Sequence, residues 1–356
     1  MGGNIFSNLS RRYSKEEYLR IESELEERFN SFFQAKVFYR IPFYSEKGSF
    51  GDLDFVLDLN AIPKKILRND WKKFIAQELN IVHSSSNGNV FSFLYEHLQI
   101  DAIAIGCSEE VEPAVRYFAY NDLSNLLGRL AHKIGMKISH KGSFLVIRDP
   151  ETANTSLIKE HLVTREYFDA LAMLGLSKER YLSGFSSKED LFRFVASSSF
   201  FQKDIYLLHN RSHRSRIRDR KRQIYHDFLE WIERENPLDR HSFSEVREHG
   251  GHGIREPYFS EVIVPFVYST QNGRDIKEEV STILSENEVE KRFRKQFFNG
   301  DLIREKTGKE GKELGKLIGE LRQRRAFPHT IEQKKQFMRT FADDPKQGLH
   351  YLLMIL

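Results

Sequence analysis

The chain has 356 residues, of which 40% are hydrophobic and 30% are charged, and its formal net charge is +4. This length allows two or three domains with sizeable cores, and the composition excludes wholesale disorder. A single cysteine, Cys107, excludes an internal disulfide and a cysteine-rich zinc site, and the sequence has no apolar run of membrane-spanning length. We therefore expect an intracellular, cytoplasmic protein without membrane association.

The first predicted elements alternate between helix and strand. A capping pattern, Ser14 followed by Glu17, marks the start of a helix over residues 14–32. Segments rich in β-branched and aromatic residues predict strands over 35–44, 52–59, 89–96 and 98–106. A further helix is predicted over 63–79, and the last two strands are close enough to form a hairpin.

Three aspartates interrupt two of these predicted strands. In GSFGDLDFVLD (48–58), Asp52 and Asp54 project from the same face because side chains alternate along a strand. Asp101 lies among aliphatic residues of strand 98–106, where burying a carboxylate is costly unless its charge is compensated. If the two strands are neighbours, the three carboxylates converge, and a bound divalent cation would offset their repulsion. The alternatives are turn or helix-cap chemistry, or three unrelated aspartates.

Converging carboxylates are what two-metal nucleotidyl transfer requires. Mg²⁺ prefers oxygen ligands, so Asp52, Asp54 and Asp101 are predicted to hold two Mg²⁺ ions, with Mn²⁺ as a substitute. We expect the same three residues to be catalytic, with Asp101 completing the site and able to accept the proton of an attacking hydroxyl.

The motif GDLDFVL, with a later aspartate in an aliphatic strand, resembles the palm of the polymerase beta nucleotidyltransferase superfamily. The resemblance continues in residues 118–139, where Asp122, Asn125 and Arg129 share a helix face, as on the nucleotide-facing helix of family X DNA polymerases. It implies that Asp122 packs against the incoming base. It also implies that Asn125 bonds the base or sugar edge and that Arg129 reaches the template strand. Taken alone, Asp122 reads as an N-cap and Arg129 as a phosphate contact or surface charge.

Phosphate binding departs from the pattern of that family. Its members carry Gly-Ser ahead of the first carboxylate, at a helix N-terminus, whereas that position here holds Ile41 and Pro42. The Gly-Ser pair of this chain, at residues 48–49, lies closer to the aspartates. We expect nucleotide binding to involve Ser49 and Gly51, with further phosphate-binding candidates at Arg40, Ser45 and Lys47.

Residues 163–201 are predicted to form two or three helices, and 214–236 a single basic-then-amphipathic helix. The apolar face of that helix is interpreted as core, through Tyr225, Phe228, Leu229 and Trp231. The segment 211–222 is predicted to bind the backbone of a nucleic acid. The alternative is a solvated helix face. Its basic residues are Arg211, Arg214, Arg216, Arg218, Arg220, Lys221 and Arg222.

The C-terminal region is predicted to be mainly helical and to bind nucleic acid. Segment 299–325 resembles the helix–turn–helix near the C-terminal end of bacterial-type CCA-adding enzymes. Gly308 and Gly311 would form its turn, and Gly315 would allow close approach of the second helix. This resemblance favours an RNA substrate.

Residues 240–275 precede segment 299–325 and are predicted to form a loop with a short strand at 261–269. Its His249 and His252 are a candidate metal pair that lacks a third spaced ligand.

These observations predict an α+β fold in three parts. They are a nucleotidyltransferase palm (1–148), a helical domain with the basic segment (149–240) and a mainly helical C-terminal region (241–356). The predicted reaction transfers a nucleoside monophosphate from an NTP or dNTP to the 3′-hydroxyl of RNA or DNA, with release of pyrophosphate. The alternatives are transfer to a protein or small-molecule acceptor, and a non-catalytic nucleic-acid-binding protein on a degenerate palm.

Overall fold

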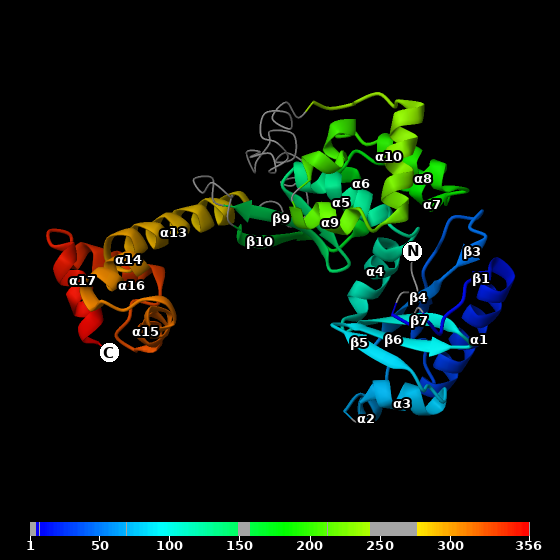
Figure 1. Ribbon diagram of the computed structural model, residues 1–356, viewed down its shortest axis with the longest axis horizontal. Helices are drawn as coiled ribbons and strands as arrows, with labels where there is room; N and C mark the ends of the chain where they lie inside the picture. Colours follow the sequence, from blue (N-terminus) through cyan, green and yellow to red (C-terminus); the bar gives the residue numbers. More distant parts are fainter. Residues whose placement is uncertain are drawn as a thin grey trace. The chain divides into compact units, whose positions relative to one another are not determined.

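The computed structural model describes residues 5–6, 8–68, 70–148, 157–211, 213–242 and 276–355. The fold is α+β, as predicted: a mixed sheet near the N-terminus is followed by a mainly helical C-terminal half (Figure 1). The described residues divide into two compact units. Unit 1 contains residues up to 146 together with 160–242, and unit 2 contains 147–148, 157–159 and 276–355.

The first helix of unit 1, α1 (Lys15–Phe33), begins where the sequence predicts. Ser14 is its N-cap, and its hydroxyl accepts the Glu17 N–H at 3.3 Å while the Glu17 carboxylate accepts the Ser14 N–H at 2.9 Å. The helix ends at Gln34, which adopts a left-handed conformation with φ 50°. Its buried face, which includes Leu25 and Phe29, packs into a hydrophobic core shared with the central sheet.

The central sheet has five strands in the order β2-β4-β7-β6-β5. In chain order they are β2 (Phe38–Arg40), β4 (Asp52–Asp58), β5 (Ser84–Asn87), β6 (Val90–Tyr95) and β7 (Leu98–Ile105). The predicted hairpin is present as β6 and β7, which are antiparallel. β4 and β7 are parallel neighbours, and their register places Asp54 opposite Asp101. The two strands that carry the aspartates therefore meet, as the sequence analysis expected.

The two faces of this sheet are covered differently. One face packs against α1 and α3 (Trp71–Glu78), with α2 (Lys64–Arg68) beside α3 (Figure 1). On the other face, Val56 and Ile103 pack against α4 (Val111–Phe118), a helix that the sequence did not predict. These contacts lie towards the carboxyl ends of β4 and β7, whereas the aspartates come two or more residues earlier on each strand. The end of this face that carries the aspartates is therefore not part of the contact with α4.

Shorter elements complete unit 1. A two-stranded sheet pairs β1 (Tyr13–Ser14) with β3 (Ser49–Phe50), and a three-stranded sheet has the order β10-β9-β8. These three strands are β8 (Met136–Ser139), β9 (Gly142–Arg148) and β10 (Leu157–Thr164). The last two residues of β9 and the first three of β10 belong to unit 2. The helices are α5 (Leu123–Lys133), α6 (Tyr167–Met173), α7 (Lys178–Leu182), α8 (Lys188–Ala196), α9 (His213–Asp219) and α10 (Gln223–Glu235).

The single helix predicted over 214–236 is in fact two helices, α9 and α10. The backbone leaves the helix between them because Arg222 is extended, with φ −103° and ψ 110°. Its guanidinium pairs with Asp122 at the start of α5. The predicted core face of α10 is confirmed for Tyr225, Phe228 and Trp231, which are buried, while Leu229 is half-buried.

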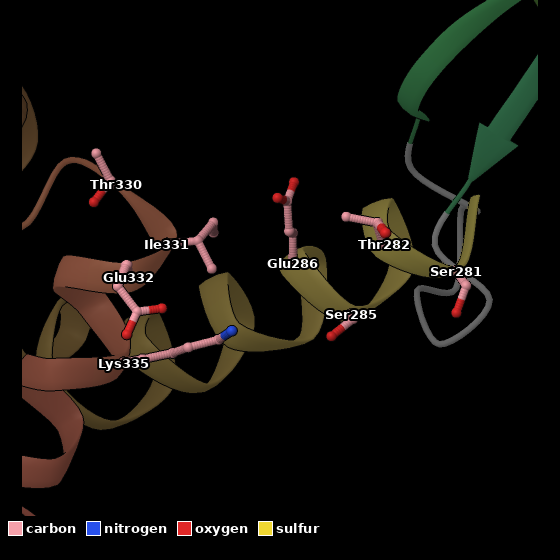
Figure 2. A pocket seen from close by; sticks show the side chains of 8 residues that line it. All are labelled: Ser281, Thr282, Ser285, Glu286, Thr330, Ile331, Glu332 and Lys335. Carbon is pink, nitrogen blue, oxygen red and sulfur yellow. The ribbon is translucent and has the colours of Figure 1, made fainter. Parts of the chain in front are cut away.

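Unit 2 is helical around a core of its own, which contains Phe293, Phe297 and Leu321. Its helices are α13 (Ile276–Phe297), α14 (Gly300–Thr307), α15 (Gly311–Gln323), α16 (Ile331–Thr340) and α17 (Pro345–Met354). A surface pocket of about 600 Å³ lies between α13 and α16, and its lining is mostly polar (Figure 2). None of the helices in the described part of the chain combines the length and apolarity needed to cross a membrane.

The predicted helix–turn–helix is present as α14 and α15. Gly308 and Gly311 form the turn with φ 68° and 53°, values that favour glycine. The expectation for Gly315 is wrong, because a Cβ added there would meet no described atom within 4 Å, so no other helix approaches closely. The histidine pair at 249 and 252 and the strand at 261–269 lie outside the described residues.

Candidate functional site

Asp52, Asp54 and Asp101 lie together on the open end of one sheet face. Asp54 is directly opposite Asp101, and Asp52 lies two residues earlier on β4, so it shares the same face. Each residue offers one carboxylate oxygen, and these oxygens all lie within 4.8 Å of one another. Among the described residues, this is the one group of three or more acidic, histidine or cysteine side chains that could hold a metal ion.

Burial and mutual repulsion make this cluster costly to ionise. Burial raises the pKa of Asp54 well above its ordinary value, and the charges of Asp52 and Asp101 raise it further. Burial also raises the pKa of Asp101, with a contribution from Asp52, while the side chains of Ser92 and Gln99 lower it. The carboxyls of Asp54 and Asp101 therefore keep protons to higher pH than ordinary aspartates. A bound cation would favour their ionised form.

The two oxygens of Asp101 have different surroundings. Oδ2 accepts the Nε2–H of Gln99 at 2.8 Å, and Oε1 of Gln99 accepts the N–H of Ile5 at 3.0 Å, which fixes the orientation of the carboxyl group. Oδ1 is buried and has no hydrogen-bond partner within the described part of the chain. A buried polar atom left unpaired costs about 1–3 kcal/mol. Three carboxylates with an orphaned oxygen fit a divalent cation that prefers oxygen ligands, such as Mg²⁺ or Mn²⁺.

A cleft of about 680 Å³ opens beside Asp52 and Asp54. Its walls come from the segment before α1, residues 41–51, the junction of α4 and α5, and the junction of α9 and α10. Four of the predicted nucleotide-binding residues line it, namely Ser49, Gly51, Asp122 and Asn125. Nδ2 of Asn125 is buried and finds no acceptor among the described residues.

Six cationic side chains line the same cleft, and they are Arg12, Lys47, Lys188, Arg218, Lys221 and Arg222. The last three belong to the predicted basic segment, so the end of that segment faces the carboxylates. Arg222 pairs with the Asp122 carboxylate. Asp122 stands at the N-cap position of α5, but its side chain makes no capping hydrogen bond. The pairing with Arg222, and not a cap, is therefore the local role of Asp122.

Arg129 and Arg211 do not have the surroundings that the sequence analysis expected. Arg129 is only 5% exposed, and it donates to the carbonyl oxygens of Ile205 at 2.6 Å and Asn210 at 3.2 Å. Arg211 pairs with the fully buried Asp219, with Nη2 and Oδ2 2.8 Å apart. Both guanidinium groups are bound to partners within unit 1, and neither lines the cleft. The predicted contacts of Arg129 with a template and of Arg211 with a phosphate are therefore not supported.

The remaining basic residues of the segment lie away from the cleft walls. Arg220 is exposed and Arg216 is half-buried, and neither lines the cleft. The side chain of Arg214 lies outside the described part of the structure.

Among the phosphate candidates, Lys47 lines the cleft and the other two are engaged elsewhere. Arg40 pairs with Glu22 and Glu26, and the Ser45 hydroxyl donates to the carbonyl oxygen of Ser186. Several cleft residues were not predicted from the sequence, and Arg12, Tyr117 and Lys188 are among them. They come from segments far apart in the chain, and no local pattern marks them as neighbours of the aspartates.

No protein-family model matches the chain, and no curated protein does either. Among solved structures, matches include two crystal structures of polymerase beta from Leishmania infantum, a ternary P/T complex and a ternary gap complex. Each is 15% identical over 48% of this chain and 76% or 70% of that chain, with a TM-score of 0.37. A likeness of this extent assigns neither an activity nor a substrate.

Proposed function

We propose that this chain is a metal-dependent nucleotidyltransferase. It adds a nucleoside monophosphate from an NTP or dNTP to the 3′-hydroxyl of a nucleic acid and releases pyrophosphate. The main support is the cluster of Asp52, Asp54 and Asp101, whose carboxylate oxygens lie within 4.8 Å of one another beside a cleft with cationic walls. Carboxylates for metal ions beside cations for phosphates are the two requirements of phosphoryl-transfer chemistry.

The reaction forms a bond between the 3′-oxygen and the α-phosphorus, and it breaks the bond from the α-phosphorus to the bridging oxygen. Pyrophosphate leaves with the bridging oxygen, and the hydroxyl proton needs an acceptor. Mg²⁺ ions held by Asp52, Asp54 and Asp101 would lower the pKa of the hydroxyl and neutralise the triphosphate. Asp101, kept ionised by the bound ions, would be the acceptor of that proton.

Other residues of the cleft bind and orient the substrates. The buried Nδ2 of Asn125 donates to the base or sugar of the nucleotide, since it has no acceptor within the described part of the protein. Arg218 and Lys221 lie where the basic segment meets the cleft, and they contact backbone phosphates of the nucleic acid.

An acceptor screen tests this function. The protein is incubated with Mg²⁺, each labelled NTP and dNTP, and separate DNA, RNA and tRNA primers, with Asp101→Asn as the inactive control. We expect extension of at least one primer, lost in EDTA and in the variant. Label on the protein or on a small molecule would instead identify a different acceptor. Nucleic-acid binding without any transfer would contradict the proposal and identify a non-catalytic binding protein.

A further inference from the structure

Arg12 and Lys47 differ from most cations of the cleft because they lack a carboxylate partner. Three of the others are paired: Lys188 with Asp227, Arg222 with Asp122, and Arg218 with Asp219. Within the described residues, no carboxylate lies at ion-pair distance from Arg12 or Lys47, although both line the cleft beside Asp52 and Asp54. Cations without a carboxylate partner at the wall of a cleft are available to an anionic ligand.

The position of Arg12 is fixed by the protein. The following residues form β1, which pairs with β3 and places Ser14 opposite Ser49. The Arg12 Nε donates to the Ser49 Oγ at 2.8 Å, and Nη2 donates to the Ser49 carbonyl oxygen at 2.9 Å. These bonds engage two of the five N–H donors of the guanidinium and orient its plane. Less conformational entropy is then lost when the remaining donors bind an anion.

Lys47 is held close to Arg12 by an aromatic surface. Its Nζ lies 4.5 Å from the ring centroid of Phe50 and 5.9 Å from that of Phe43. Burial lowers the pKa of Lys47, Asp52 and Asp54 raise it, and the nearby charge of Arg12 lowers it again. Two like charges kept close together without a carboxylate partner suit a ligand that carries several negative charges on adjacent groups.

We propose that Arg12 and Lys47 hold the β- and γ-phosphates of the incoming nucleoside triphosphate, with Ser49 as the positioning residue of Arg12. This inference rests on the proposed function and assigns its triphosphate subsite to the N-terminal segment and residues 41–51. The subsite thus takes the place of the Gly-Ser helix N-terminus that the sequence lacks. It predicts selection for a triphosphate over a monophosphate and over the phosphodiesters of a nucleic-acid backbone.

The test is calorimetric titration with inorganic tripolyphosphate, in Mg²⁺ and separately in EDTA. A charge-assisted hydrogen bond is worth about 10- to 100-fold in affinity, so Arg12→Gln and Lys47→Gln should each weaken binding by about that factor. Arg11→Gln is the matched control, because Arg11 pairs with the Glu17 carboxylate at 3.0 Å and does not line the cleft. We expect it to change the affinity by less than about threefold.

Ser49→Ala tests the positioning role. It should weaken tripolyphosphate binding in the wild-type background and have no further effect once Arg12 is replaced, because Ser49 acts through Arg12. Adenosine monophosphate and a short single-stranded oligonucleotide should bind the wild type and both charge variants equally.

Wild-type affinity for tripolyphosphate in both charge variants would overturn the inference, and so would an equal loss in the Arg11→Gln control. Primer extension with normal nucleotide KM in both variants would refute the subsite and leave the proposed function standing. If Arg12→Gln fails to fold, Lys47→Gln decides the question alone, since its Nζ is held by ring contacts.

Discussion

Removing one carboxylate from the aspartate cluster should stabilise the metal-free protein. The change is Asp101→Asn, which keeps the shape of the side chain and can still accept the hydrogen bond from Gln99. It removes one of three negative charges that are partly buried on one sheet face. Carboxylates clustered to bind a cation destabilise the protein when the cation is absent. The substitution should therefore stabilise the fold although it lowers activity.

The magnitude follows from the separation of the carboxylate oxygens, which is at most 4.8 Å. Two unit charges at that distance repel by about 3.5 kcal/mol at an effective dielectric constant near 20, and by about 0.9 kcal/mol in water. Partial protonation of the cluster reduces the repulsion in the wild type. We therefore expect Asp101→Asn to raise the free energy of unfolding by roughly 1–3 kcal/mol in EDTA at pH 8.

The effect should depend on pH with a definite sign. The pKa of Asp54 and of Asp101 is raised in the folded state, so folding takes up protons and stability is lost as pH rises through the folded-state pKa. The loss of stability from carboxylate repulsion vanishes below the ordinary aspartate pKa of 3.8, because the carboxyls are then protonated in both the folded and the unfolded protein. The advantage of Asp101→Asn should therefore be large at pH 8 and shrink towards pH 4.

Urea unfolding followed by tryptophan fluorescence measures this difference. Both tryptophans, Trp71 and Trp231, lie in unit 1, so the signal reports the unit that contains the cluster. Glu27→Gln, at an exposed position of α1, is the control for loss of a carboxylate and should leave stability unchanged. Mg²⁺ should stabilise the wild type more than Asp101→Asn. A variant less stable than the wild type in EDTA at pH 8, or equal stabilisation by Mg²⁺, would refute the reasoning.

Three further changes test the walls of the cleft and the buried arginines. Asn125→Ala should raise the nucleotide KM, because a lost neutral hydrogen bond costs about 0.5–1.5 kcal/mol, or about 2- to 12-fold, in steady-state kinetics. The double change Arg218→Gln and Lys221→Gln should flatten the log–log salt dependence of primer binding by about 1.5 units, since two phosphate contacts are lost. Arg211→Ala should destabilise unit 1 by roughly 3 kcal/mol in urea unfolding, because it takes the main partner from the buried Asp219.

Each of these changes has an outcome that would count against it. If Asn125→Ala left the kinetics unchanged with every nucleotide, Asn125 would not contribute to nucleotide binding. Arg216→Gln with Arg220→Gln is the control for the salt slope, since neither residue lines the cleft. An equal flattening in that control would mean that the whole basic segment follows the backbone. A loss below about 1 kcal/mol for Arg211→Ala would mean that Arg218 alone satisfies Asp219.

The convergence of the carboxylates could be predicted because it depends on strand geometry. Side-chain alternation places Asp52 and Asp54 on one face of a strand. Asp101 lies among aliphatic residues of β7, where a carboxylate is costly unless a cation or another partner compensates its charge. The structure adds only that β4 and β7 are neighbours, with Asp54 opposite Asp101. The capping box at Ser14 and the buried face of α10 were predictable for the same reason, since both are local patterns.

The rest of the site depends on contacts between distant segments. Arg12 lies at the cleft because the next two residues form β1, which pairs with β3. A strand of two residues is too short to show a periodic pattern in the sequence. Helical spacing put Arg129 on the face of Asn125, but the 205–210 segment covers that end of α5 and its carbonyl groups bind the guanidinium. The sequence likewise did not indicate the break at Arg222, whose guanidinium pairs with Asp122, 100 residues earlier.

The most direct test of the account is single-turnover nucleotide transfer by the wild type and Asp101→Asn, on the primer that the acceptor screen identifies. We expect the variant to lose at least about three orders of magnitude in rate, which is about 4 kcal/mol in the barrier. Its primer and tripolyphosphate affinities should stay within about threefold of the wild type, and Glu27→Gln should react normally. A folded Asp101→Asn protein that transfers within tenfold of the wild-type rate would contradict the three-carboxylate site.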